Sequence, residues 1–211
     1  MIFSFAAPSR DRQRTLAAAS LKTGGKGEGT VHQSAATKPG NIPRDVEAFL
    51  QHWKKVARTG LVPTLADFLD APPFKLQSVV AIVDVVSSTE LRFRLFGTGL
   101  STMAGVDLTG TDVLSNFHPT ARAEASRIAW TGVSRPCGYL LRRGMRRGVI
   151  ETTAVGIGLP LLHESSGRVG LVGFRSVLEK SVDVAESGES PFVKAFNLIR
   201  WIDIGAGIPD T

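Results

Sequence analysis

Residues 79–96 have the sequence VVAIVDVVSSTELRFRLF, which predicts a β-hairpin. Residues 79–86 are mostly apolar and β-branched, and residues 91–96 alternate between apolar and charged side chains. The polar segment between the two runs, Ser87-Ser88-Thr89, is typical of a turn. Two runs of this kind are expected to pair as neighbouring strands of one sheet.

After the hairpin, helical patterns come first and strand patterns follow. Glycines break residues 98–117 into short helical turns, and residues 120–133 carry small and apolar side chains on one helical face. Three strands are then predicted at residues 137–142, 149–159 and 168–178, with turns at residues 143–148 and 163–167. A doubly wound parallel sheet needs strict alternation of strands and helices. The order found here excludes that class and predicts an α+β domain with one five-stranded antiparallel sheet.

A helix is predicted before the hairpin, at residues 43–59. Apolar side chains recur there at the spacing of one helical face, and they include Phe49, Leu50, Trp53 and Val56. Acidic residues near its start and basic residues near its end suit the helix dipole. We expect this helix to flank the sheet, either in its own chain or in a dimer partner, and we expect a short helical turn at residues 65–69.

Two segments of different composition flank the predicted domain at residues 43–180. Residues 1–42 are dominated by Ser, Thr, Gly, Lys and Ala, which predicts a flexible basic tail. Residues 181–211 predict an acidic linker followed by an amphipathic helix, because residues 191–204 place Phe192, Ala195, Phe196, Ile199 and Ile202 on one helical face. A chain of 211 residues is therefore one domain with appendages.

The net charge of +6 belongs mostly to the predicted tail. Residues 1–44 carry seven basic and two acidic residues, a net charge of +5, whereas residues 45–211 carry 18 basic and 17 acidic residues, a net charge of +1. A groove that neutralises phosphates places its excess charge on the domain itself. The core is therefore not expected to bind DNA.

Cysteine usage and hydropathy predict a cytoplasmic protein without a membrane span. The single cysteine, Cys137, excludes an internal disulfide and a multi-thiolate metal site. The four histidines share no metal-ligand spacing. No apolar run approaches the ~20 residues that cross a bilayer, and residues 1–7 lack the leading positive region of a secretory signal.

Five short motifs follow one another along the chain. They are Phe49-x-x-x-Trp53 with Gly60-Leu61-Val62-Pro63, Arg92-Phe93-Arg94-Leu95-Phe96-Gly97-Thr98, Gly105-x-x-Leu108-x-Gly110, Gly132-x-x-x-Pro136 and Leu159-Pro160-Leu161. Their order and spacing resemble the PAS sensor fold, specifically a bacterial family of small, mostly stand-alone PAS proteins, over residues 45–178. The resemblance implies a five-stranded antiparallel sheet with short helices around a small cavity on one face, and a flanking helix or a partner on the other.

Such a fold implies a non-enzymatic signalling module that binds a small molecule, a protein partner or both, and that relays its signal by protein contact as a homodimer. We expect Phe93, Arg94, Trp130 and Tyr139 to line the ligand pocket. No cofactor is assigned. Cys137 opens a strand and does not lie in the helix that a photoactive flavin requires, and His118, the candidate for a haem ligand, precedes a proline at a helix entry. A ligand-free adaptor is the first alternative.

Small residues recur within the strand predicted at residues 149–159. Ala154, Gly156 and Gly158 alternate there with bulky side chains, so one face of the strand is flat. A backbone or a helix can approach such a face closely. We expect the helix at residues 43–59 to pack on it.

Arg142, Arg143, Arg146 and Arg147 are predicted to share one hairpin turn. Guanidinium groups bind phosphates and carboxylates in bidentate fashion, so an anion or an acidic protein partner is expected there unless the turn is simply solvated. The Arg142-x-x-x-Arg146 spacing resembles cyclic-dinucleotide receptors of the PilZ type, although their downstream Asp/Asn-x-Ser-x-x-Gly element is missing. A nucleotide-binding effector is therefore the second alternative. The sequence has no Gly-x-Ser-x-Gly, His-Glu-x-x-His or Gly-x-Gly-x-x-Gly motif, so catalysis is not predicted.

Overall fold

One antiparallel sheet organises the part of the chain that the structure describes. The structure is a computed structural model that describes residues 42–71, 77–164, 167–182 and 192–210. Within these ranges the strands are β1 (Val80–Val85), β2 (Leu91–Phe96), β3 (Gly138–Arg147), β4 (Ile150–His163), β5 (Arg168–Val182) and β6 (Phe192–Ile202). The helices are α1 (Arg44–Lys55), α2 (Leu65–Asp70), α3 (Thr98–Ala104) and α4 (Pro119–Ser134), with short 3₁₀ turns η1 (Gln77–Val79) and η2 (Leu114–Asn116).

The sheet order is β2-β1-β5-β4-β3-β6, and every neighbouring pair is antiparallel. This confirms the predicted α+β class. The hairpin from residues 79–96 is confirmed as β1 and β2, and the helical turn expected at residues 65–69 is α2. The sheet has one strand more than the five that were predicted.

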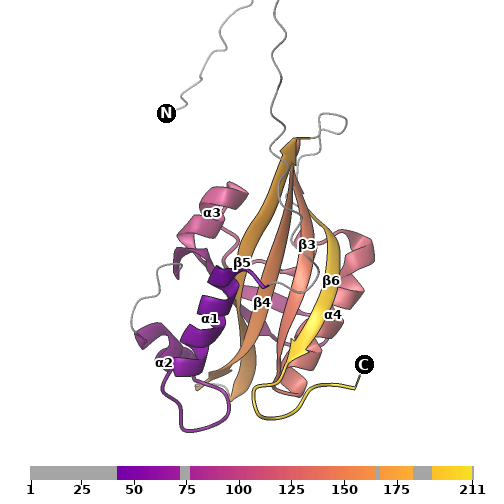
Figure 1. The fold of residues 1–211 in the computed structure, drawn as a ribbon. Coiled ribbons are helices and arrows are strands. Elements are labelled where there is room, and N and C mark those ends of the chain that lie inside the picture. Colours follow the sequence, from indigo (N-terminus) through magenta and orange to yellow (C-terminus); the bar gives the residue numbers. More distant parts are fainter. Residues whose placement is uncertain (1–41, 72–76, 165–166, 183–191, 211) are drawn as a thin grey trace, which may run out of the picture. The chain divides into compact units, whose positions relative to one another are not determined.

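Helices cover both faces of the sheet. Helix α1 lies across β4 and β5 on one face, and α4 lies on the other face beside β6 (Figure 1). Each face has its own hydrophobic core, because successive side chains of a strand point to opposite sides. Leu140 of β3, for example, belongs to the α1 core, and its neighbours Tyr139 and Leu141 belong to the α4 core.

Helix α1 is held by the apolar face that its sequence predicts. Phe49, Leu50, Trp53 and Val56 are all buried against the chain's own sheet. The ring of Phe49 stacks on Phe174 of β5 with centroids 5.1 Å apart, and the indole Nε1 of Trp53 donates a hydrogen bond of 3.1 Å to the carbonyl oxygen of Pro160 in β4. Helix α1 therefore flanks the sheet of its own chain, which was one of the two arrangements expected.

The prediction that α1 packs on the small-residue face of β4 is wrong. Helix α1 shares its core with Val155, Ile157, Leu159 and Leu161, which are the bulky side chains of β4. The opposite, small-residue face is covered by side chains of β3, because a Cβ atom on Gly158 would collide with the ring of Tyr139. The small residues of β4 therefore make room for a neighbouring strand's side chains, and the helix on their side of the sheet is α4, not α1.

The predicted C-terminal helix is also wrong, because its residues form strand β6. This strand pairs with β3 from Gly138↔Ile202 to Arg146↔Phe192. The register shifts twice, between Leu140 and Leu141 and between Gly144 and Met145, so that Ile199 and Lys194 are extra residues in β6. Strand β6 covers the edge that β3 would otherwise expose.

The arginine-rich stretch is a strand and not a turn. Strand β3 continues to Arg147, and β4 begins at Ile150, so the reversal takes place at Gly148 and Val149. Gly148 has a φ of 56°, a left-handed conformation that favours glycine. At the far end of β4, the Leu159-Pro160-Leu161 motif lies inside the strand, which continues to His163. Most of the predicted tail and of the predicted acidic linker lies outside the described residues.

Candidate functional site

A cavity of about 390 Å³ lies on the α4 face of the sheet. Its walls come from the inner faces of the strands and from α3, η2 and α4, and most of its lining is apolar. Aromatic side chains lining it include Phe93, Phe96, Phe117 and Phe196. Cavities of this size and character bind small organic molecules.

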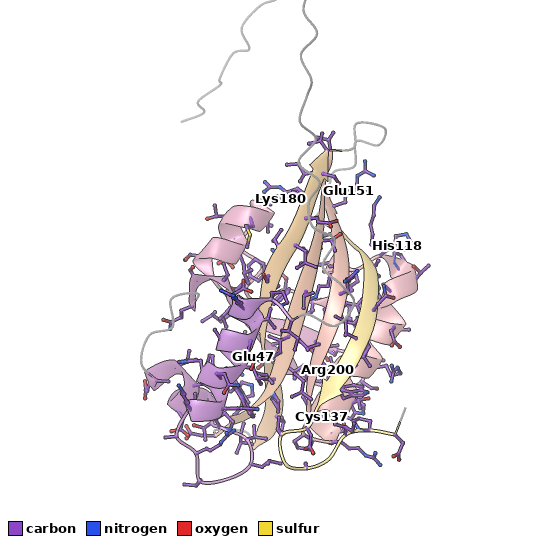
Figure 2. The ribbon with its side chains drawn as sticks, viewed as in Figure 1. Glu47, His118, Cys137, Glu151, Lys180 and Arg200 are labelled. Atoms are coloured by element: carbon purple, nitrogen blue, oxygen red, sulfur yellow. The ribbon has the colours of Figure 1, made fainter. Side chains whose placement is uncertain are left out.

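The charged part of the lining has one sign. The cationic residues that line the cavity are Arg143, Arg146, Arg147, Arg175 and Lys180, and the described lining residues include no Asp or Glu. Lys180 lies near Glu151 at the end of the sheet opposite Cys137 (Figure 2). An apolar chamber with a cationic wall suits a ligand that combines an anionic group with an apolar body.

Arg143 and Arg175 are partly buried and only partly paired. Among the described residues, the Nε atoms of both side chains are buried and have no hydrogen-bond partner. A terminal nitrogen of Arg175, Nη1, lies 2.7 Å from the thioether sulfur of Met145, which is a weak acceptor, and the guanidinium carbon of Arg143 lies 5.7 Å from the ring centroid of Phe196. These contacts give each cation a neighbour but no counter-charge.

Burial changes the proton affinity of both groups. Burial lowers the pKa of Arg175 to about 10, and the adjacent charge of Arg143 lowers it further in the same direction. Burial also lowers the pKa of Arg143, against a smaller opposing effect of Tyr139. A pKa near 10 still leaves Arg175 protonated at neutral pH, so the cavity wall carries two neighbouring positive charges.

The other two arginines of the cavity wall have polar partners within the fold. Arg146 is buried and donates from Nε to the carbonyl oxygen of Gly148 at 3.0 Å, with Glu151 at 3.7 Å from its Nη1. Arg147 donates from Nη1 to the carbonyl oxygen of Met103 at 2.7 Å, which ties β3 to the end of α3. These two side chains brace the cavity wall, in contrast to Arg143 and Arg175.

The structure divides the four residues that we expected in the ligand pocket. Phe93 and Tyr139 line the cavity, whereas Arg94 and Trp130 do not belong to its described lining. Arg94 is exposed and pairs with Asp84 at 2.7 Å, and Trp130 is 41% exposed on α4. Burial raises the pKa of Tyr139 to about 12, so its hydroxyl keeps its proton at neutral pH.

The arginine cluster divides in a similar way. Arg143, Arg146 and Arg147 line the cavity, but Arg142 is exposed and lies outside the lining. Arg142 and Arg143 are successive residues of β3 and point to opposite faces, whereas Arg146 and Arg147 both reach the cavity at the end of the strand, next to the reversal at Gly148 and Val149. Phe49, Leu50, Trp53 and Val56 lie in the α1 core, on the other side of the sheet from the cavity.

Sequence reasoning missed Arg175. It lies on β5 with Leu171, Gly173 and Val177, all of which line the cavity from the same face of the strand. The sequence signal that could have identified Arg175 is a charged residue inside an apolar strand. The alternation of side chains along a strand places it on the same inward face as Leu171 and Val177. Met145, which contacts Arg175, was also missed because its segment was predicted as a turn.

A second polar cluster joins β1, β2 and β4. His163 is buried at the end of β4, although a turn was expected there, and its Nε2 lies 3.1 Å from Oδ1 of Asp84. Asp84 also pairs with Arg94. The imidazole reaches across β5 over Gly170, where a Cβ atom would collide with it. Burial lowers the pKa of His163, and the carboxylate of Asp84 opposes this shift.

Cys137 and His118 are the remaining candidates for a nucleophile or a metal ligand. Cys137 is buried just before β3, and burial raises its thiol pKa to about 11, which keeps the thiol protonated. His118 is exposed at the start of α4 beside Thr120. In the described ranges no three His, Cys, Asp or Glu side chains gather into a metal site.

Comparisons with known proteins give one result. A family model described as a PAS domain matches residues 43–169, which is more than half of the chain. The match runs from the residue before α1 to the start of β5 and includes most elements that enclose the cavity. Neither the curated proteins nor the solved structures contain a match. Among the helices in the described part of the chain, none is long and apolar enough to cross a membrane.

Proposed function

The chain belongs to the PAS domain family, and on that premise we propose that it is a sensor that binds a small molecule in the cavity and relays the event to a protein partner. PAS domains are sensory and signalling modules, and in general they are not catalytic. The proposal makes the cavity the input site of this module. Phe93 and Tyr139 are its proposed ligand contacts, together with the cationic residues of the wall.

The observation that carries the ligand proposal is the cavity itself. Its volume of about 390 Å³ falls in the range of small-molecule sites, and it is lined mostly by apolar side chains with a few polar groups on one wall. The cavity opens to the surface, since Ile150, Val177 and Lys180 of its lining are exposed. An apolar space of this size is therefore expected to hold a ligand.

The relay proposal is supported by where α3 lies. Met103 of α3 lines the cavity and is also 37% exposed, so the same side chain can touch a bound molecule and a partner protein. Arg147 of the cavity wall donates to the carbonyl oxygen of Met103, which couples α3 to β3. We propose that ligand binding shifts α3 and that a partner protein, or a second copy in a homodimer, detects the shift.

Native mass spectrometry of the purified full-length protein tests this proposal. We expect a reproducible extra mass of small-molecule size that is lost on denaturation, and the same spectrum reports whether the chain is dimeric. A bare chain mass from several expression hosts, with no thermal shift from a library of small organic compounds, would instead favour the ligand-free adaptor. A pull-down that compares wild type with Met103→Asp then tests the partner contact.

A further inference from the structure

We propose that the cavity binds an amphipathic anion, in which one oxyanion group, a carboxylate or a phosphate, is held between Arg143 and Arg175 and an apolar body fills the rest of the space. This inference rests on the proposed function, because it names the ligand class of the same cavity. It differs from the sequence expectation, which placed an anion on an exposed turn.

The two guanidinium groups are the first line of support. Their Nε atoms are buried without an acceptor among the described residues. A buried donor without a partner costs ~1–3 kcal/mol, and more when the group is charged, so folded proteins rarely leave one unsatisfied. The Nε atoms themselves have no accessible surface, so an anion in the cavity would be held by the terminal nitrogens of these two cations, which line the cavity and have no carboxylate partner among the described residues.

The arrangement of the strands brings the two arginines to the same place. Arg143 pairs with Ala154 of β4, and Arg175 pairs with Gly156, so the two side chains approach from the strands on either side of β4. A Cβ atom on Gly156 would lie 3.4 Å from Nε and Nη2 of Arg143. The absence of a side chain at Gly156 therefore makes room for the guanidinium group of Arg143 over β4.

The charges of the wall support the same ligand class. Arg143 and Arg175 repel each other, and no carboxylate belongs to the described cavity lining. Buried charges in proteins are normally paired, because an uncompensated ion in a low-dielectric site is expensive. A single anion between the arginines removes both the repulsion and the unpaired charge.

The rest of the lining specifies the body of the ligand. Away from the arginines, most of the cavity wall is apolar, with side chains such as Leu91, Phe93, Val113 and Phe117. A polar body would lose hydration over this part of the wall and gain few hydrogen bonds in return. An alkyl or aromatic body of moderate length is therefore expected, and a fully charged or sugar-rich molecule is not.

The experiment compares three series of probes that share one alkyl chain. Straight-chain carboxylates, alkyl phosphates and primary alcohols with six to fourteen carbons are titrated into the full-length protein by isothermal calorimetry, below their critical micelle concentrations. We expect at least one anion series to bind about 10- to 100-fold more tightly than the alcohol of the same length, the effect of a charge-assisted hydrogen bond. The two anion series distinguish a carboxylate ligand from a phosphate ligand.

Variants of the arginines locate the effect. Arg143→Met and Arg175→Met should each remove most of the preference for the anion while leaving the affinity for the alcohol within about twofold. Arg142→Met is the matched control, because this arginine lies on the same strand but outside the cavity lining. The control should keep the full preference.

Folding of the variants is checked without any ligand. Removing an uncompensated buried cation should leave the melting temperature of the empty protein unchanged or raise it. If Arg175→Met unfolds, Arg175→Gln provides a second variant that is polar, shorter and uncharged.

Two results separate this inference from the proposed function. Equal affinity for alcohols and anions, or an anion preference that survives in both arginine variants, would overturn the anionic ligand class and leave the cavity as a ligand site. Failure of all three series to bind, together with a bare native mass, would overturn both proposals.

Discussion

The ring of Tyr139 lies directly over Gly158, its antiparallel partner across the β3–β4 pair. A Cβ atom at Gly158 would collide with the phenol carbon and oxygen of that ring. On its other side, Tyr139 makes an edge contact with Trp201 of β6, with ring centroids 6.2 Å apart. The tyrosine is thus fixed between two strands while it forms part of the cavity wall.

Replacement of this glycine tests how tightly the ring is fixed. We expect Gly158→Ala to lower the free energy of unfolding by ~1–3 kcal/mol, the usual cost of forcing an extra methyl group into a packed site. In a Tyr139→Ala background the same change should cost much less, because the clash is gone. Urea denaturation of the four proteins measures the coupling.

A matched control is available on the next strand. Gly173 pairs with Gly158, but the atom nearest to a Cβ there is the carbonyl oxygen of Ile157 at 3.7 Å, an ordinary contact distance. Gly173→Ala should therefore cost little. Equal losses at both glycines would mean that general strand effects, and not the tyrosine ring, set the cost.

Periodicity was sufficient to predict most of the fold. The hairpin, α1, α4 and the three later strands follow from apolar spacing and turn residues, because each of these elements buries one regular face. The order of elements then gave the α+β class. These predictions needed no knowledge of long-range contacts.

Strand β6 shows where periodicity misleads. Its side chains that point into the α4 core are Val193, Phe196, Leu198 and Trp201, at intervals of three, two and three residues. A regular strand would give intervals of two, but the extra residues Lys194 and Ile199 lengthen two of them. The bulges removed the alternation that identifies a strand, and the helical face that was predicted instead shares only Phe196 with this core set.

The candidate site was predictable only in part for a related reason. Phe93 and Tyr139 lie on strands whose alternation was recognised, and both line the cavity. Arg143, Met145 and Arg147 were assigned to a turn because their segment, residues 143–148, is rich in arginine and glycine and does not alternate like the strands around it. A cavity wall with inward-facing arginines breaks the rule that inward positions are apolar, and only a charge inside an apolar strand, as at Arg175, points to it.

His163 should make stability depend on pH. Its folded-state pKa is lowered from the ordinary value of 6.5, mainly by burial, so the folded protein binds this proton less readily than the unfolded chain. The free energy of unfolding then rises with pH wherever the unfolded state holds more protons. We expect the stabilising contribution to be complete above about pH 6.5 and to be lost as the pH falls toward the folded-state pKa.

Denaturation of His163→Gln between pH 5 and 8 measures this contribution. The variant should lose the part of the acid dependence that wild type shows below about pH 6.5. His118→Gln is the control, since His118 is exposed on the surface at the start of α4. An unchanged acid limb in the His163 variant would show that other groups cause the dependence.

Cys137 gives a second probe, because it is the only cysteine of the chain. Its thiol is buried and has a pKa of about 11, raised mainly by burial and further by Asp203. Since the thiolate is the reactive form, we expect iodoacetamide at pH 8 to label the folded protein at least about 100-fold more slowly than the urea-unfolded protein. Equal labelling rates would mean that the start of β3 opens readily in the native state.

The two extra residues of β6 allow a sharp test of its register. Ile199 is 47% exposed and has no partner of its own on β3, since Leu141 pairs with Leu198 and Leu140 pairs with Arg200. Deleting Ile199 should join these pairs into a regular ladder without changing which side chains face the core.

Deleting Asn197, which pairs with Arg142, shifts the strand by one residue and turns Phe196 and Val193 outward. Exposing such side chains costs ~1.5–3 kcal/mol each, so the Asn197 deletion should unfold at much lower urea than the Ile199 deletion. Similar midpoints for the two deletions would contradict the pairing of β6 with β3 in this register.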